Sequence, residues 1–243
     1  MAFIPKIQLQ NFHNPSVSFL QARNLAYSKT EDLFVPQESK QQNNIDTNIT
    51  LTPQILKILK ENNIPLNVNQ NILSNLQHGH LKNTRIVAAQ MYSSIPAELK
   101  KEISMQDLQQ AALLHDYGKI LIPEKILNKH GTLNEQERKI IELHPILGYE
   151  LLKNKDLNSN VLNLIKYHHQ NIHGDGYPKI EDDYHPSIAA DILHAADEYT
   201  ALREERTYKK ALSKQEALDI VKQDVEAGKI SPVAYNALVK VVT

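Results

Sequence analysis

From Thr52 to the C-terminus, apolar residues recur at the three- to four-residue spacing of α-helices, and no segment alternates as a strand would. Thr52 and Pro53 form an N-cap and N1 pair, and the helix that they open ends at residues 62–65. Further helices are predicted over residues 71–95, 104 to near 118, 134–155 with a break near Pro145, 158–169, 186–204, 214–227 and 232–242, with a turn at 123–128. The periodicity therefore predicts an all-α domain over residues 51–243.

The first 50 residues differ from the rest of the chain. Their hydrophobic residues have no sustained period, and residues 37–49 read QESKQQNNIDTNI, which offers too little apolar surface to order itself. We expect residues 1–50 to form an irregular arm or tether ahead of the helical domain at residues 51–243. The sequence contains no internal repeat.

The composition excludes several classes of protein. With no cysteine, the chain cannot contain a disulfide scaffold, a zinc ribbon or a cysteine nucleophile. A net charge of −1 gives no overall attraction to DNA or to an anionic membrane. No apolar run approaches the roughly 20 residues of a membrane span, and the start MAFIPKIQLQ lacks the regions of a signal peptide. We therefore expect a cytoplasmic protein without a membrane span; the sequence does not fix its oligomeric state.

Histidine is the unusual component of this sequence. Nine of the 11 histidines lie between His78 and His185, and several stand on the apolar sides or at the ends of predicted helices. A single histidine in such a place is usually a core residue with a hydrogen-bond partner. Burying many polar groups together is unfavourable, however, unless something common satisfies them. The inward-facing set comprises His80, expected in mid-helix, and His115, Asp116, His144, His168, His169 and Asp197.

A metal centre is the simplest common explanation for this set. It offers five imidazoles, two carboxylates and no thiolate. Such borderline and hard ligands suit two octahedral divalent ions, iron or manganese, better than one tetrahedral zinc ion. A helical domain that buries these groups without a metal is the structural alternative.

Basic residues and a glycine-rich loop stand next to the proposed ligands in the sequence. The basic residues are Lys119, one turn beyond His115, and Arg206, Lys209 and Lys210, which follow Asp197. A basic run is normally a solvated face, yet this placement favours contact with phosphate groups. The loop at residues 174–178, GDGYP, is either an ordinary turn or the rim of a nucleotide site at which Tyr177 offers a ring for base stacking.

At residues 168–178 the sequence HHQNIHGDGYP resembles the HHExxxGxGYP signature of the HD-GYP phosphodiesterases, the all-α branch of the HD superfamily that hydrolyses cyclic di-GMP. The resemblance extends to LLHDYGKILIPEKILNKHGTLNEQER, LHPILGYELL, HAADEYTALREERTYKKALS and EAGKISPVAYNAL, and so covers roughly residues 75–243. An ordered series of motifs of this kind is highly specific. It implies an HD-superfamily helical bundle with a metal centre in its core.

The resemblance also implies roles for individual residues. One metal would be held by His80, His115 and Asp197, and a second by His144, His168 and His169, with Asp116 bridging the two. Lys119 would lie near the scissile phosphate and act in catalysis beside Asp116. Substrate contacts are implied for Lys119, Tyr177, Arg206 and Lys209.

Four positions depart from the family pattern. Gln170 replaces the glutamate of HHE, which removes a charge beside the ligands and is expected to weaken the tuning of the metal centre. Leu76 stands one turn before His80, where members with three metals have a glutamate, so two metals are expected. Thr200 replaces the second aspartate of DxxDAL, and Thr207 replaces the proline of RPYR.

The implied reaction is hydrolysis of cyclic di-GMP to pGpG, GMP or both by a metal-bridging hydroxide, with Lys119 and Arg206 stabilising the added negative charge. Three alternatives stay open. The first is a catalytically weak HD-GYP domain that serves as a cyclic di-GMP receptor or docks a diguanylate cyclase through the GYP loop. The second is another HD phosphohydrolase that acts on nucleotides or on a related cyclic dinucleotide. The third is the metal-free structural domain.

Overall fold

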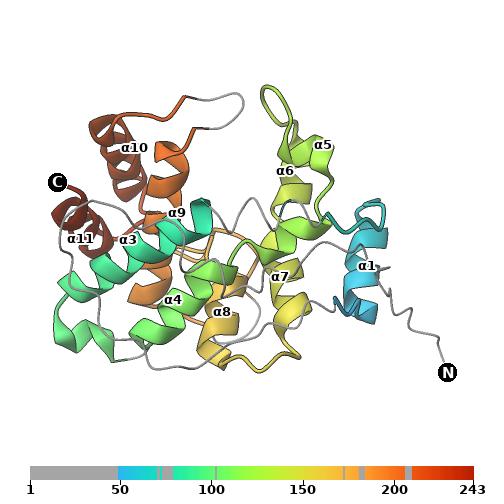
Figure 1. The fold of residues 1–243 in the computed structure, drawn as a ribbon, viewed down its shortest axis with the longest axis horizontal. Helices are drawn as coiled ribbons and strands as arrows, with labels where there is room; N and C mark the ends of the chain where they lie inside the picture. The colour runs from blue at the N-terminus through green and yellow to red at the C-terminus, as the bar shows by residue number, and fades with distance from the viewer. Residues whose placement is uncertain are drawn as a thin grey trace, which may run out of the picture. The chain divides into compact units, whose positions relative to one another are not determined.

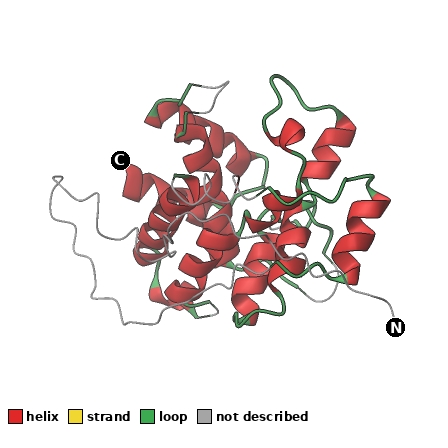
Figure 2. Ribbon diagram, turned by 45° about the vertical axis from the view of Figure 1, so that its right-hand side comes forward, coloured by secondary structure: helices red, strands yellow, loops and turns green. Residues whose placement is uncertain are grey.

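The computed structural model describes residues 49–69, 72, 79–101, 103–171, 173–180, 184–205 and 210–243. Within this part of the chain the regular elements are helices, and the β-bridge between His169 and Tyr177 is isolated (Figure 1, Figure 2). The prediction of an all-α domain is therefore confirmed. Residues 52–243 form one compact unit, and the predicted arm over residues 1–50 lies almost entirely outside the described residues.

Most of the described α-helices begin at a residue whose side chain caps the first turn. In chain order the elements are α1 (Pro53–Glu61), α3 (His80–Ser94), η2 (Ala97–Lys100), α4 (Met105–Leu114), η3 (Tyr117–Leu121), α5 (Glu124–Leu127), α6 (Glu135–Ile141), α7 (His144–Leu152), α8 (Ser159–Tyr167), α9 (Ile188–Arg203), α10 (Lys214–Glu226) and α11 (Pro232–Val242), where η marks a 3-10 helix. The side chains that accept a hydrogen bond from the first turn of the following helix are Thr52, Ser104, Asn134, Asn158, Ser187, Ser213 and Ser231. None of the helices in the described ranges has both the length and the apolar character needed to cross a bilayer.

Helix α9 is the central element of the unit. It packs against α3, α4, α8, α10 and α11, and most of its residues are buried (Figure 1). Its buried face includes Ala189, Ala190, Ala195 and Ala196, whose small side chains allow neighbouring helices to approach closely. Side chains on that face, Asp197 among them, therefore lie in the middle of the unit.

The helix predicted over residues 71–95 is interrupted at Gly79, and α3 begins after this break. Its first residue is His80, and the backbone of Gly79 has φ −126° and ψ −85°, which is outside the helical region. His80 therefore opens a helix and does not lie in mid-helix as predicted. Residues 73–78 of the predicted segment lie outside the described residues.

Three other predicted boundaries also shift. Helix α4 ends at Leu114, short of Gly118, because the chain tightens there into the 3-10 helix η3. The break predicted near Pro145 falls at residues 142–143, since proline is well suited to the first turn of α7. Residues 123–128, predicted as a turn, contain the one-turn helix α5.

Gly118 lets two backbone segments touch beside the histidine-rich region. A Cβ atom at Gly118 would lie 2.0 Å from the carbonyl oxygen of His144 and 2.5 Å from the backbone nitrogen of Gly148. Only glycine fits such a contact. Helix η3 is thus held directly against the start of α7, so the segment that carries Asp116 and Lys119 lies next to His144.

Candidate metal centre

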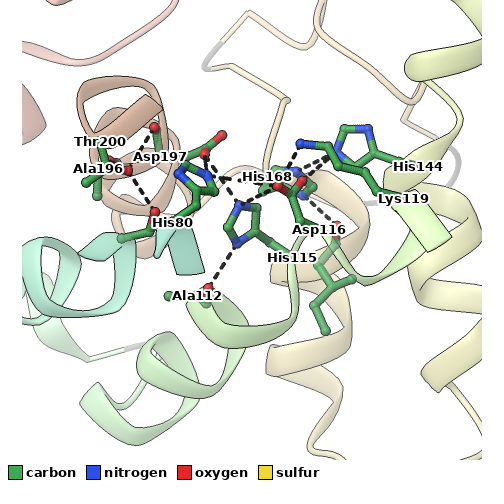
Figure 3. A network of polar contacts seen from close by, with 12 residues as sticks. His80, Ala112, His115, Asp116, Lys119, His144, His168, Ala196, Asp197 and Thr200 are labelled. Atoms are coloured by element: carbon green, nitrogen blue, oxygen red, sulfur yellow. Dashed lines mark hydrogen bonds and ion pairs between the residues drawn. The ribbon is translucent and has the colours of Figure 1, made fainter. Parts of the chain in front are cut away.

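The seven histidine and aspartate side chains predicted to face inward converge in the structure, and Figure 3 labels all of them except His169. His80 opens α3, His115 and Asp116 follow α4, His144 opens α7, His168 and His169 follow α8, and Asp197 lies within α9. Six of them are at most 9% exposed, and His169 is half-buried. Helix ends from four elements therefore meet one residue of the central helix.

The first cluster consists of His80, His115, Asp116 and Asp197. One ligand atom each from His80, His115 and Asp116 lies within 4.8 Å of the other two. The Oδ1 atom of Asp197 lies 2.7 Å from Nε2 of His80 and 3.4 Å from Nε2 of His115. Two imidazole nitrogens and two carboxylates thus face one small volume.

The second cluster consists of His144, His168 and His169, whose ligand atoms also lie within 4.8 Å of one another. The Nε2 atoms of His144 and His168 are 3.1 Å apart. In both rings Nδ1 lies 2.8 Å from a backbone carbonyl oxygen, Ile141 for His144 and Ile165 for His168. A carbonyl only accepts, so Nδ1 carries the proton and the two neutral rings point Nε2 lone pairs at each other. A cation between them would satisfy both.

Three of the histidines share one way of being oriented. His115, His144 and His168 each donate from Nδ1 to the carbonyl of the residue three positions earlier, and for His115 this is Ala112, at 3.0 Å. Metal-binding histidines usually donate their other ring N–H to such a partner, which fixes the tautomer and the ring orientation. The backbone at these helix ends therefore directs Nε2 toward the centre.

Asp116 connects the two clusters. Its Oδ1 atom lies 3.3 Å from Nε2 of His144, and its Oδ2 atom lies 3.7 Å from Nε2 of His115. Oδ2 also accepts from Nζ of Lys119 at 2.6 Å. This carboxylate faces both sets of imidazoles, as a bridging ligand would.

The titration of the second cluster favours neutral imidazoles. Burial, reinforced by neighbouring histidines, holds the pKa of His168 and that of His169 well below the ordinary value. Burial also lowers the pKa of His144, although Asp116 opposes this. Neutral imidazole is the form that binds a metal.

In the first cluster the carboxylates shift the neighbouring groups toward their charged forms, unlike in the second cluster. Burial raises the pKa of Asp116, but Lys119, His115 and His144 outweigh it and hold that pKa well below the ordinary value. Burial likewise raises the pKa of Asp197, yet His115 and His80 bring it well below the ordinary value. For His80, burial lowers the pKa, whereas Asp197 and Glu204 raise it to about 10. Ionised carboxylates here attract positive charge.

Three buried atoms at the centre have no hydrogen-bond partner among the described residues. They are Nδ1 of His80, Nε2 of His115 and Oδ1 of Asp116. A buried polar atom without a partner is costly, and such atoms in a native fold call for an ion, a water or a catalytic role. The donor set of imidazoles and carboxylates without thiolate suits divalent ions with borderline or hard character. The residues present therefore fit a metal centre.

The glycine-rich loop lies against the second cluster. The ring of Tyr177 stacks on that of His169, with centroids 4.6 Å apart and 27° between the planes. The backbone N–H of Tyr177 donates to the carbonyl of His169 at 3.2 Å, and the Tyr177–Pro178 peptide is cis. Burial and then the charges of Asp197 and Asp116 raise the pKa of the Tyr177 hydroxyl. One face of the ring predicted to stack on a base is thus covered by a histidine.

The Gln170 side chain is hydrogen-bonded to the glycine-rich loop. Its Nε2 atom donates to the carbonyl of Pro178 at 2.5 Å, and its Oε1 atom accepts from the backbone N–H of Gly176 at 3.2 Å. Thr200, the other described departure, joins α9 to α3 through a 2.8 Å hydrogen bond with Thr84. Four further predicted positions lie outside the described residues: Arg206, Lys209, Leu76 and Thr207.

Glu204 is a neighbour of the centre that the sequence did not reveal. Its Oε2 atom lies 3.2 Å from Nδ1 of His80, as an ion-pair contact without in-line hydrogen-bond geometry. The sequence places Glu204 seven residues after Asp197, and it is the residue that directly follows the last turn of α9. That spacing alone did not distinguish Glu204 from other acidic residues at the end of the helix.

Comparison with known proteins gives a family match and several relatives. The model of the HD domain family matches residues 67–232. The cyclic di-GMP phosphodiesterase PdeB of Borreliella burgdorferi is 31% identical over 134 residues, which cover 55% of this chain and 35% of that protein. The 3'3'-cGAMP-specific phosphodiesterase 1 of Vibrio cholerae is 29% identical over 153 residues, with 63% and 36% covered. The cyclic di-GMP phosphodiesterase response regulator RpfG of Xanthomonas campestris is 37% identical over 120 residues, with 48% and 32% covered.

The chain spans about a third of the length of these relatives. Among solved structures, Bd1817, an HDG"Y"P protein from Bdellovibrio bacteriovorus, superposes with a TM-score of 0.55 and 20% identity. The superposition covers 79% of this chain and 57% of that one. This likeness concerns the fold.

Proposed function

Because this chain belongs to the HD domain family, and within it to the HD-GYP group, we propose that it is a metal-dependent phosphodiesterase that hydrolyses cyclic di-GMP. The observation that carries the proposal is the pair of buried clusters joined by Asp116. Opposed lone pairs and ionised carboxylates are costly there unless cations satisfy them. The products would be linear pGpG and, after a second cleavage, GMP.

The residues divide into two ligand sets. His80, His115 and Asp197 would hold one divalent ion, and His144, His168 and His169 would hold the other, with Asp116 shared. Iron or manganese suits this donor set. Ions held there would supply the activation of water and the positive charge that phosphodiester hydrolysis requires.

Lys119 has a position suited to the substrate phosphate. Its ammonium group lies 2.6 Å from Asp116, and its side chain is 21% exposed. It can therefore reach a ligand at the rim while remaining beside the shared carboxylate. Lys119 would neutralise charge that develops on the phosphate oxygens. Tyr177, Arg206 and Lys209 would add contacts to the rest of the nucleotide.

Two related substrates suit such a site. The names of the relatives include both cyclic di-GMP and 3'3'-cGAMP phosphodiesterases at similar identity. Both molecules carry two 3'–5' phosphodiester bonds and differ in one purine, so the metal centre could serve either. A diguanylate cyclase that docks on the GYP loop is a further partner suggested by the resemblance alone.

The test combines metal analysis with product analysis on one sample. The protein is purified without oxygen, its iron and manganese are counted, and it is then incubated with cyclic di-GMP or 3'3'-cGAMP before chromatography. We expect about two ions per chain and the appearance of linear dinucleotide or mononucleotide. Asp116→Asn should abolish metal loading and turnover together, whereas the exposed Asp156→Asn should change neither.

Each other outcome selects an alternative. Metal present with tightly bound but unchanged cyclic di-GMP would identify a receptor. Turnover of mononucleotides alone would identify another kind of HD phosphohydrolase. No metal in the anaerobic sample, and none after incubation with iron(II) or manganese(II), would leave a structural domain. Full activity of the Asp116→Asn variant would refute the shared-carboxylate arrangement.

A further inference from the structure

Gln170 occupies a buried position between the metal centre and the GYP loop. It follows His169 directly and is 2% exposed. Its amide group makes two hydrogen bonds to the loop, one on each side of Tyr177. The Nε2 atom donates to the carbonyl of Pro178, and the Oε1 atom accepts from the N–H of Gly176.

These bonds belong to a larger set that fixes the loop on residues 169–170. Tyr177 itself donates its backbone N–H to the carbonyl of His169. A Cβ atom at Gly176 would lie 2.2 Å from that carbonyl oxygen and 2.8 Å from Cα of Gln170. Three successive loop residues, 176–178, are therefore tied to the two residues that end the HHQ motif.

An amide is the side chain that this arrangement requires. The loop presents a donor at Gly176 and an acceptor at Pro178, and an amide matches both at once. An ionised glutamate, the residue of the resembled signature, could accept from Gly176 but could not donate to Pro178. A buried carbonyl that loses its donor carries a desolvation cost.

We propose that Gln170 is a positioning residue. Its two hydrogen bonds fix the GYP loop and thereby hold the Tyr177 ring against His169 at the metal centre. Glutamine in place of glutamate is then a feature of this chain's loop geometry and not a loss of function at the ligands. The consequence for substrate rests on the proposed function. Because the loop is already ordered, Tyr177 can contact the cyclic dinucleotide without the free-energy cost of ordering the loop.

The first test uses the metal-loaded protein without substrate. Amide hydrogen exchange is followed by mass spectrometry in peptides that cover residues 171–178, for the wild type, Gln170→Ala, Gln170→Glu and Gln136→Ala. Gln136 is an exposed glutamine on α6 and serves as the control. Gln170→Ala should exchange about tenfold faster or more in this segment, with metal content unchanged. Gln170→Glu should fall between it and the wild type, because the carboxylate can still accept from Gly176.

The second test uses turnover of cyclic di-GMP. Gln170→Ala should raise KM about tenfold with a smaller change in kcat, since the loop contacts substrate and the ligands are untouched. Gln170→Glu preserves side-chain size and keeps the proposal testable if the alanine variant does not fold. Gln136→Ala should match the wild type in both tests.

Three results would overturn this role of Gln170. The first is a Gln170→Ala variant whose loop amides exchange at the wild-type rate, and the second is a Gln170→Glu variant that matches the wild type in both exchange and KM. The third is loss of metal from both variants while the exchange of the loop stays unchanged. If the wild type neither binds nor hydrolyses a cyclic dinucleotide, the proposed function fails. The exchange comparison still decides the role of Gln170 in that case.

Discussion

At the scale of single residues, the imidazole rings of the centre are oriented by different kinds of partner. For His115, His144 and His168 the partner of Nδ1 is a main-chain carbonyl, which no side-chain substitution can remove. For His80 the neighbouring group on Nδ1 is the carboxylate of Glu204, at 3.2 Å. That ring therefore depends on a side chain that can be changed.

Replacing Glu204 should weaken the first cluster. We expect Glu204→Ala to lower the affinity for one of two manganese ions by about tenfold to a hundredfold, as losing an outer partner of a metal-binding histidine usually does. The measurement is a competition titration with a chromogenic chelator. The control is Glu205→Ala, the next residue, which is exposed. Equal affinities of the two variants for both ions would contradict the role of Glu204.

Gly118 provides a second test at this scale, and its readout is stability. A methyl group at this position would overlap the His144 carbonyl and the Gly148 nitrogen, both of which are backbone atoms that cannot turn away. We expect Gly118→Ala to lower the free energy of unfolding in urea by about 2–4 kcal/mol. Gly79→Ala is the matched control, because a Cβ atom there meets nothing within 4 Å. Equal stabilities of the two variants would show that η3 can move away from α7 at little cost.

At the scale of elements, the contact between α9 and α10 contains a pair of carboxyl groups. Burial and the hydrogen bond with Asp224 raise the pKa of Glu198 to about 8. Asp224 is also bound by Lys229, whose Nζ atom lies 2.7 Å from Oδ1. Near neutral pH, Glu198 is therefore the member of the pair that keeps a proton.

This pair should make the packing of α9 on α10 sensitive to pH. The pKa of Glu198 in the folded state, about 8, lies above its ordinary value, so the folded protein keeps a proton that the unfolded chain loses. Stability should therefore fall as pH rises toward 8. We expect the melting temperature of the metal-loaded wild type to drop more between pH 6 and pH 8 than that of Glu198→Gln.

The exposed Glu226→Gln serves as the control and should keep the wild-type dependence on pH. Glu198→Gln should also be the more stable of the two variants at pH 8, because it removes a charge that is buried there. Parallel pH curves for all three proteins would show that Glu198 does not carry the effect.

The elements also show what can be predicted from sequence. Helix starts such as those capped by Ser104, Ser187 and Ser231 were predictable because the capping contact is made within one turn. The convergence of the histidines was predictable because the family motifs mark them. The start of α3 was not predicted, because Gly79 interrupts the helix within a long stretch of helically spaced apolar residues. The contacts of Gln170 and Glu204 were not predicted, because tertiary packing decides their partners and a local sequence pattern does not reveal it.

At the scale of the whole molecule, the buried centre ties together helices from most of residues 80–197. An ion that binds only the folded state stabilises it in proportion to the logarithm of its concentration over Kd. We expect chelation to lower the melting temperature by about 5–10 °C relative to protein in metal at one hundred times Kd. His168→Ala should reduce this difference and Gln136→Ala should preserve it. Equal melting temperatures with and without metal would contradict the prediction.

The contact between His80 and Asp197 joins residues 117 positions apart, whereas His144 and His168 are 24 apart. The first and second clusters can therefore form at different times during synthesis of the chain. The second cluster can assemble once α7 and α8 have left the ribosome, because closing a short loop is fast. The first cluster must wait for α9, so the contact between His144 and His168 can form in the nascent chain before the contact between His80 and Asp197.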